Sequence, residues 1–119
     1  MRVLVCGGRQ FDDTAYLNSK LDELHLQHGF TVLIEGCARG ADQLAGAWAD
    51  AYGIAHLKFP ADWDRLGRKA GPIRNKQMLD EGRPDLVVAF PGNSGTFNMC
   101  RQAEAAGVRV IKVEPERVA

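Results

Sequence analysis

The sequence alternates short apolar runs with longer stretches whose apolar residues recur at helical spacing. The apolar runs lie at residues 2–6, 31–34, 54–59, 86–89 and 108–113. Their length suits strands, and the nearly continuous apolar character of RVLVC and LVVA is typical of strands buried on both faces of a parallel sheet. Because parallel neighbours must be joined by crossover connections, this alternation predicts an α/β domain with right-handed crossovers.

Two helices are predicted in the first half of the chain. Asp12 or Asp13 is placed to cap the first helix, and Gly29 is placed to end it. The second ends at Gly53 and carries an apolar stripe, formed by Leu44, Ala45, Trp48, Ala49 and Tyr52. The stripe presents more apolar surface than the thin edge of a small sheet covers, so we expect a homodimer. Packing of the stripe against the sheet explains it equally well.

Two further helices complete the pattern. After an irregular segment at residues 60–71, a third helix is predicted to begin at Pro72 and to end near Gly82. The fourth is predicted at about residues 96–106. No repeat or linker interrupts residues 1–119, so we expect a single Rossmann-like domain with three layers and a five-stranded parallel sheet of order 3-2-1-4-5.

This topology predicts where a ligand binds. Ligands of open α/β sheets bind beyond the carboxyl ends of the strands, where the strand order reverses. The reversal lies between the first and fourth strands, so the loops at residues 7–13 and 90–96 are expected to face each other. The loop at residues 36–42 is expected alongside them. All three loops are rich in glycine.

Charge and cysteine content exclude several classes of protein. Lysine plus arginine and aspartate plus glutamate both number 15, so the formal net charge is zero. A protein that binds duplex DNA or a membrane surface needs a positive excess, so both classes are disfavoured. The chain shows no signal-peptide pattern and no apolar run of membrane-spanning length, and a cytoplasmic protein is expected. Its three cysteines do not form a disulfide framework.

Common cofactor and metal motifs are absent from the sequence. There is no G-x-x-x-x-G-K-[ST] of a P-loop, and the first loop reads CGGRQF rather than the G-x-G-x-x-G of a dinucleotide-binding fold. No C-x-x-C or H-E-x-x-H offers metal ligands, so neither a metal nor a cofactor is expected. Cys6, Cys37 and Cys100 all fall near the carboxyl edge of the predicted sheet, where thiols could meet.

The loop at residues 91–96 has the composition of a phosphate site. Gly92 and Gly95 let backbone N–H groups approach an anion, and the following helix N-terminus adds partial positive charge. Ser94 and Thr96 supply hydroxyl donors. The alternative interpretation is a tight strand-to-helix turn without a ligand.

The loop at residues 36–40 is a second candidate. Gly36 and Gly40 flank Arg39, whose guanidinium can contact phosphate. Asp42 begins the next helix, where it either holds ribose hydroxyls or only complements the helix dipole.

Other candidate ligand-binding residues surround these loops. Arg9 directly follows Gly7 and Gly8 after the first strand, so its side chain is expected to enter the crevice, a solvated arginine being the alternative. Arg74 and Asn75 are expected in the first turn of the third helix, where they can bind the same anion. Trp63 either stacks on a base as part of a lid or plugs the edge of the core.

Four segments together resemble the YspA-like branch of the SLOG superfamily. They read GGRQFDD, EGCARGADQLAGAWA, FPADWDRLGRKAGPIRNKQM and AFPGNSGTFNM, and the resemblance runs from about Val3 to Val113. That superfamily is Rossmann-like and includes the LOG phosphoribohydrolases, which cleave nucleoside monophosphates at the glycosidic bond, and the DNA-processing protein DprA. The resemblance implies a nucleotide-like ligand in the predicted crevice.

One motif departs from the LOG pattern P-G-G-x-G-T-x-x-E. Asn93 stands at the second glycine, and Met99 stands at the glutamate that serves the hydrolytic site. The phosphate-binding part of the motif is kept without its acid, so LOG-type hydrolysis is in doubt. Glu35 and Asp42 are the carboxylates that could substitute for it.

The sequence therefore favours one function and leaves others open. The first is binding of a nucleotide or nucleotide-derived ligand, with a sensor as one form of it, and the second is N-glycosidic hydrolysis of a nucleoside monophosphate or an ADP-ribose-like compound. Single-stranded nucleic-acid binding is a less favoured alternative because it needs a positive groove with aromatic side chains. One basic cluster supports it, formed by Arg65, Arg68, Lys69, Arg74 and Lys76. A crevice that binds a partner protein is a further alternative.

Overall fold

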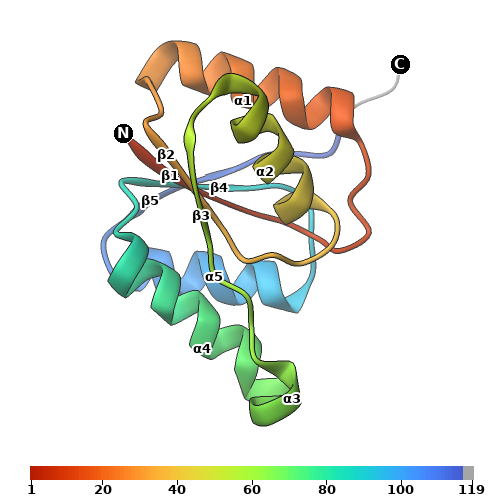
Figure 1. Cartoon of the computed structure of the whole chain (residues 1–119), viewed down its shortest axis with the longest axis vertical. Coiled ribbons are helices and arrows are strands. Elements are labelled where there is room, and N and C mark those ends of the chain that lie inside the picture. Colours follow the sequence, from red (N-terminus) through yellow and green to blue (C-terminus); the bar gives the residue numbers. More distant parts are fainter. Residues whose placement is uncertain (117–119) are drawn as a thin grey trace.

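Within residues 1–116, which the computed structural model describes, five parallel strands form one sheet of order β3-β2-β1-β4-β5 (Figure 1). The strands are β1 (Arg2–Cys6), β2 (Val32–Glu35), β3 (Ala55–Lys58), β4 (Leu86–Ala89) and β5 (Arg109–Lys112). The predicted α/β class and strand order are confirmed, and each strand lies within a residue or two of its predicted range.

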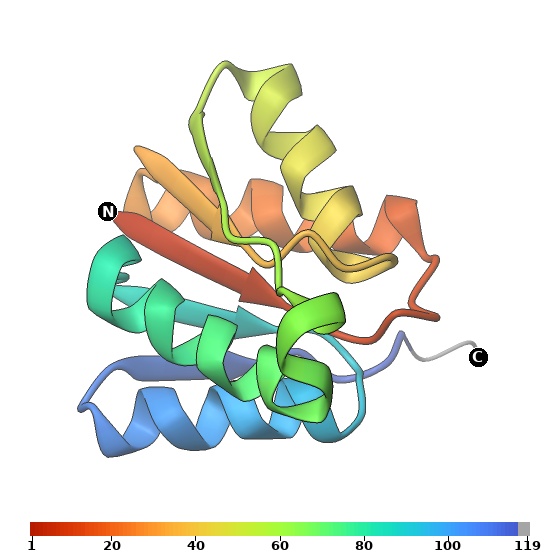
Figure 2. The same ribbon diagram turned by 60° about the horizontal axis from the view of Figure 1, so that its bottom comes forward.

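Helices cover both faces of the sheet, as Figures 1 and 2 show. The helices α1 (Thr14–His28) and α2 (Ala41–Tyr52) pack on one face. The other face carries α4 (Ala70–Gln77), its π-helical extension η2 (Met78–Gly82) and α5 (Ser94–Ala105). The short helix α3 (Trp63–Leu66) and the 3-10 turn η1 (Gly67–Lys69) lie at the carboxyl end of the strands, beside α4.

The central strand β1 shows why this sequence forms a three-layer sheet. Val3 and Val5 belong to the core beneath α1 and α2, whereas Leu4 and Cys6 belong to the core beneath α4 and α5. All four side chains are buried. Because successive side chains point to opposite faces and both faces are covered by helices, the strand is apolar at every one of these positions.

The predicted ends of the first helix are confirmed. The carboxylate of Asp13 accepts a hydrogen bond from the backbone N–H of Tyr16 at 3.1 Å, which satisfies a free donor of the first turn. Gly29 ends α1 in the left-handed conformation with φ of 68°.

The segment at residues 60–71 is more helical than predicted. It contains α3 and η1, and the carboxylate of Asp62 accepts from the backbone N–H of Arg65 at 3.3 Å. Because η1 runs directly into α4, that helix begins at Ala70, two residues before Pro72. Arg74 therefore lies beyond the first turn, and the prediction of free N–H groups beside it was wrong.

The apolar stripe of α2 packs inside the protein. Ala45, Trp48 and Ala49 are buried in the core, and Tyr52 is half-exposed with its hydroxyl donating to Asp22. Core packing accounts for the stripe, so it carries no argument for a homodimer. Among residues 1–116, no helix combines the length and the apolar character needed to cross a bilayer.

Candidate functional site

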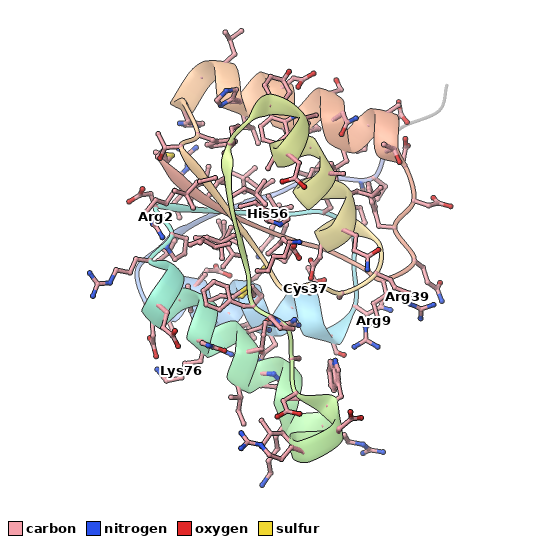
Figure 3. The ribbon with its side chains drawn as sticks, viewed as in Figure 1. Arg2, Arg9, Cys37, Arg39, His56 and Lys76 are labelled. Carbon is pink, nitrogen blue, oxygen red and sulfur yellow. The ribbon has the colours of Figure 1, made fainter. Side chains whose placement is uncertain are left out.

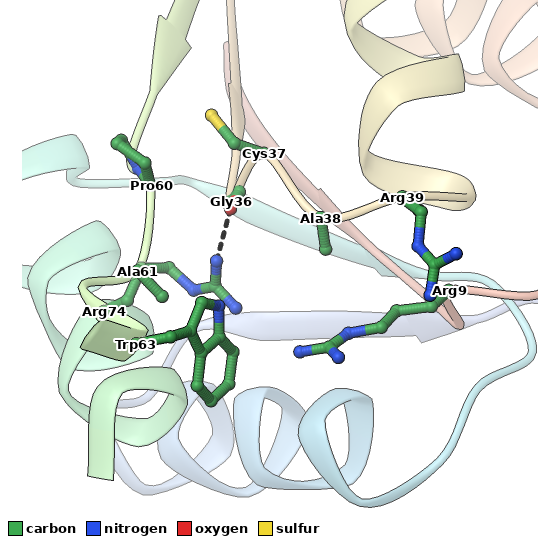
Figure 4. Close-up of a pocket in the computed structure, with 9 residues that line it drawn as sticks. All are labelled: Arg9, Gly36, Cys37, Ala38, Arg39, Pro60, Ala61, Trp63 and Arg74. Atoms are coloured by element: carbon green, nitrogen blue, oxygen red, sulfur yellow. Dashed lines mark hydrogen bonds between the residues drawn. The ribbon is translucent and has the colours of Figure 1, made fainter. Parts of the chain in front are cut away.

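A pocket of about 300 Å³ opens at the carboxyl end of the sheet (Figure 4). Loops after β1, β2 and β3 and the helix α4 contribute its walls. The lining residues are Arg9, Gly36, Cys37, Ala38, Arg39, Pro60, Ala61, Trp63 and Arg74. The pocket thus lies on the β2 side of the predicted crevice, and the loop at residues 91–96 does not line it.

The lining carries three guanidinium groups and no carboxylate. Arg9 comes from the loop after β1, Arg39 from the loop after β2, and Arg74 from α4. In a chain whose formal net charge is zero, this is a local concentration of positive charge. A pocket with this lining favours an anionic ligand.

Arg74 is held in place by its neighbours. Its Nη1 donates to the carbonyl of Gly36, and its Nε donates to the side-chain oxygen of Asn75 at 3.0 Å. A Cβ at position 36 would overlap the guanidinium, so a larger residue there would displace the Arg74 side chain. Burial lowers the pKa of Arg74, while the carboxylate of Asp42 opposes that effect.

Trp63 forms one wall of the pocket. Its side chain lies against Gly71, where a Cβ would be 3.2 Å from the ring atom Cη2. The guanidinium of Arg9 lies over the indole ring, and 45% of Trp63 is exposed to solvent. An indole exposed to this extent does not plug the core, and its stacking on a base stays a prediction.

Asp42 lies behind the lining. It is buried, and its carboxylate accepts from the backbone N–H of Ala38 at 3.1 Å. Burial raises its pKa to about 6, although the Ala38 N–H and the nearby Arg74 both oppose the rise. Glu35 is also buried, and its two oxygens are occupied by the backbone N–H of Cys37 and by His56.

Several predicted site residues lie outside the pocket lining and pack the loops together. The backbone N–H of Gly8 donates to the carbonyl of Pro91 at 2.9 Å, and a Cβ at Gly8 would be 3.1 Å from the Cα of Gly92. Gly7 and Gly40 are equally crowded, by Ala41 and by the backbone at Gly8 and Arg9. The loops after β1 and β4 do face each other, but their backbones touch and leave no room between them.

Asn75 and the first turn of α5 form a neighbouring group. Asn75 is buried and donates to the carbonyl of Gly95 at 3.3 Å and to the side-chain oxygen of Asn98 at 3.1 Å, which ties α4 to α5. Ser94, Gly95 and Thr96 form that first turn. Their proposed contact with phosphate stays a prediction.

Met99 occupies a core position. The helix α5 begins at Ser94, earlier than predicted, so Met99 falls in its second turn with 1% of its surface exposed. It packs in the core cluster that includes Leu4 and Val87. The predicted helix start near residue 96 would have placed position 99 in the first turn, where a carboxylate is tolerated; the start at Ser94 makes that placement wrong.

Two of the three cysteines meet. Cys6 and Cys100 lie in the same core cluster; interaction with Cys6 lowers the pKa of Cys100 to about 7, and interaction with Cys100 raises the pKa of Cys6. Cys37 lines the pocket instead, and burial raises its pKa. In the part of the chain that the structure describes, no cluster of three or more His, Cys, Asp or Glu side chains is arranged to hold a metal.

Sequence reasoning missed four lining residues and one residue behind the lining. No motif marks Cys37, Ala38, Pro60 and Ala61 as binding residues. Pro60 and Ala61 reach the pocket because the segment after β3 runs on toward α3 beside the loop after β2 (Figure 4). His56 was expected on an edge strand, which is confirmed, but its contact with Glu35 was not predicted. The alternation of polar and apolar residues in HLKF would place His56 on the solvent face, so it gave no signal for this contact.

Known proteins resemble this chain in sequence and in fold. Residues 1–66 match the model of the YspA, cpYpsA-related SLOG family. The Gene 61 protein of Mycobacterium phage D29 is 39% identical over 118 residues, which cover 92% of this chain and 94% of that protein.

A solved structure shares the fold. The X-ray structure of DNA processing protein A (DprA) from Streptococcus pneumoniae superimposes with a TM-score of 0.76 at 20% sequence identity. The match covers 97% of this chain and 50% of the DprA chain, so this chain spans half the length of that neighbour. The match of the family model over more than half of the chain shows that the chain belongs to the YspA, cpYpsA-related SLOG family.

Proposed function

We propose that the protein binds a nucleotide or a nucleotide-derived ligand in the pocket between β1, β2, β3 and α4. The observation that carries this proposal is that Arg9, Arg39 and Arg74 line one open pocket together with the half-exposed Trp63. Membership of the SLOG family supports a nucleotide-related ligand.

The arginines suit phosphate. A guanidinium presents several N–H donors in a plane, which match the oxygens of a phosphate in bidentate geometry. Arg74 uses one donor on Gly36 and one on Asn75, so three of its five N–H donors remain for a ligand. The lining holds no carboxylate that would repel the anion.

Trp63 suits a base or another planar group. An indole that is partly exposed at a pocket wall offers a large apolar face, and stacking on it stabilises any base because every base has a π-face. The positive groups and the aromatic face lie on the same pocket, which fits a ligand with both a phosphate and a base.

Hydrolysis of the bound ligand is the second candidate, and Asp42 is the observation that favours it. A carboxyl whose pKa is raised to about 6 is suited to general acid–base work near neutral pH. Asp42 nevertheless accepts a backbone hydrogen bond behind the lining, and position 99 carries no carboxylate. These two features favour binding without turnover.

A calorimetric binding screen tests the proposal. Adenosine 5′-monophosphate, ADP, ADP-ribose, adenosine and inorganic phosphate are compared on the same protein. We expect the phosphorylated nucleosides to bind more tightly than adenosine or phosphate alone, because only they use both parts of the pocket. Arg9→Ala and Arg39→Ala are expected to weaken binding, whereas Arg109→Ala on the exposed edge strand β5 serves as the matched control.

Chromatography of the same mixtures separates binding from turnover. Binding without release of a free base supports the first candidate. Release of a base that Asp42→Asn abolishes would establish the second candidate instead. Absence of any binding at millimolar concentration, or equal affinity in all three arginine variants, would contradict the proposed pocket.

A further inference from the structure

A buried ion pair lies behind the pocket, between the end of β2 and the edge strand β3. The Nε2 atom of His56 is 2.6 Å from Oε2 of Glu35, and the two side chains are 10% and 3% exposed. The other ring nitrogen, Nδ1, is 3.2 Å from Oδ1 of Asp50 on α2. Carboxylate oxygens therefore lie within hydrogen-bond distance of both ring nitrogens of His56.

The helix α2 makes room for this imidazole. A Cβ at Gly46 would lie 2.5 Å from Cε1 of His56, so any larger residue at that position would displace the ring. The ring is thus enclosed by Gly46 on one side and by two carboxylates at its edge. Figure 3 shows where His56 lies relative to Cys37, Arg9 and Arg39 of the pocket.

The ion pair connects to the pocket through one turn of the backbone. The second oxygen of Glu35, Oε1, accepts from the backbone N–H of Cys37. Cys37 has φ of 64°, a left-handed conformation that is uncommon for any residue other than glycine and that needs support from its surroundings. The carbonyl of Gly36, the residue before it, accepts from Nη1 of Arg74.

The contact between Glu35 and His56 is expected to contribute little net free energy to folding. The cost of desolvating two buried charges offsets most of their attraction, whereas such pairs can select one conformation among several. Here the conformation selected is the left-handed turn at Cys37, because Glu35 binds the N–H that this turn presents.

We infer that His56 is a positioning residue for the pocket: through Glu35 it holds the Gly36–Cys37 turn and so orients the guanidinium of Arg74 toward the ligand. This inference rests on the proposed function, in which Arg74 contacts phosphate. His56 itself does not line the pocket and touches no ligand.

A double-mutant cycle tests the inference, with adenosine 5′-monophosphate as the probe. His56→Leu removes the donor to Glu35, and His56→Gln keeps an amide donor of similar reach. We expect His56→Leu to weaken binding by about tenfold in the wild-type background and by less than about twofold when Arg74 is Met. His56→Gln is expected to restore most of the affinity that His56→Leu loses.

Amide hydrogen exchange gives a readout that needs no ligand. The N–H of Cys37 is expected to exchange faster in His56→Leu than in the wild type, by more than the change in global stability explains. His25→Gln is the control, because His25 is likewise a hydrogen-bonded histidine, accepting from the backbone N–H of Phe30 at 2.9 Å, but lies away from the pocket. That variant is expected to leave both the Cys37 exchange and the affinity unchanged.

The outcomes separate the two claims. Equal loss of affinity in the wild-type and Arg74→Met backgrounds would overturn the positioning role, because His56 would then act without Arg74. Unchanged exchange at Cys37 would overturn it as well. If the probe binds none of the proteins, the proposed function fails for this nucleotide, and the exchange at Cys37 still decides whether His56 holds the turn.

Discussion

The guanidinium of Arg9 lies over the indole of Trp63, with its Cζ atom 5.0 Å from the ring centroid. Arg9 follows the central strand β1, and Trp63 opens α3 on the opposite wall of the pocket. A cation over an aromatic face is attracted by the ring quadrupole, more strongly when water is excluded. The contact thus joins the two groups that we propose bind phosphate and stack on a base, across the pocket.

Replacement of Trp63 tests the stacking role. Trp63→Ala is expected to weaken binding of adenosine 5′-monophosphate by roughly 5- to 100-fold, the range of base–aromatic stacking. Trp63→Phe should retain most of the affinity because it keeps an aromatic face. Calorimetry measures both variants, and Trp48→Phe, a change in the core, is the control. Unchanged affinity in Trp63→Ala would remove Trp63 from the site.

A comparison of two glycines tests how closely the loops pack. Gly40 has φ of 78° and Gly107 has φ of 76°, but a Cβ would meet the carbonyl of Arg9 at 2.7 Å in the first case and open space in the second. Gly107→Ala is expected to cost about 1 kcal/mol of unfolding free energy from backbone strain alone. Gly40→Ala should cost about 2–4 kcal/mol because overpacking adds to the strain. Urea unfolding measures both values. Equal losses of unfolding free energy in the two variants would show that the loops around Gly40 rearrange to accept the added methyl group.

The fold could be predicted because each strand is specified by its own residues. Leu86–Ala89 is apolar at every position and buried at every position, as a central strand requires. Asp13 and Gly29 mark the ends of α1 through local backbone chemistry. The start of α4 was predicted too late because Pro72 is a strong local signal for a helix start, whereas the 3-10 turn at residues 67–69 leads into the helix without such a signal.

The site was predicted only in part. Arg9, Arg39, Trp63 and Arg74 were expected near the ligand, and all four line one pocket. The glycines after β1 and β4 look the same in sequence whether they approach a phosphate or another backbone, and the structure shows backbone against backbone at Gly8. The contacts of Arg74 with Gly36 and of His56 with Glu35 join residues far apart in the chain, so no local pattern marks them.

The raised pKa of Asp42 predicts how stability depends on pH. Its pKa rises from 3.8 in the unfolded chain to about 6 in the folded one because burial disfavours the charged form. Between these values the folded state holds more protons, so this group's contribution to the free energy of unfolding declines as pH rises through that window. The full decline is roughly 3 kcal/mol, at about 1.4 kcal/mol per pKa unit.

Asp42→Asn is the variant that checks this dependence. The amide oxygen still accepts from the Ala38 N–H without carrying a charge. We expect the variant to be more stable than the wild type above about pH 6 and to lose the slope between about pH 4 and pH 6. Urea unfolding at several pH values measures it. An unchanged slope would show that Asp42 is solvated in solution.

The pair Cys6 and Cys100 predicts one thiol that ionises near neutral pH. Interaction with Cys6, helped by the charge of Lys112, lowers the pKa of Cys100 to about 7 against the effect of burial. The ultraviolet absorbance of the thiolate should therefore rise with a midpoint near that value. Cys6→Ala is expected to raise the midpoint because it removes that interaction, whereas Cys37→Ala should leave it unchanged. Wild-type absorbance that rises only above about pH 8 would contradict the pairing.

The buried position of Met99 predicts that the acidic residue of the LOG motif would destabilise this chain. The side chain is 1% exposed and packs among Leu4, Val87 and Ala89, so a carboxylate there would have no polar partner in the cluster. Met99→Glu must be protonated to stay buried, which at pH 7 costs about 4 kcal/mol, from about 1.4 kcal/mol for each unit above the ordinary pKa near 4.3. Met99→Leu, which conserves the volume, is expected to cost less than about 1.5 kcal/mol. Because the folded pKa of the glutamate would be raised, its penalty should shrink as pH falls toward 4, and urea unfolding at two pH values measures that trend. The variant is also expected to release no base from adenosine 5′-monophosphate, since position 99 faces the core rather than the pocket.

A Met99→Glu protein as stable as Met99→Leu at pH 7 would contradict this prediction. It would show that the side chain at position 99 reaches solvent and that the acid could serve the site.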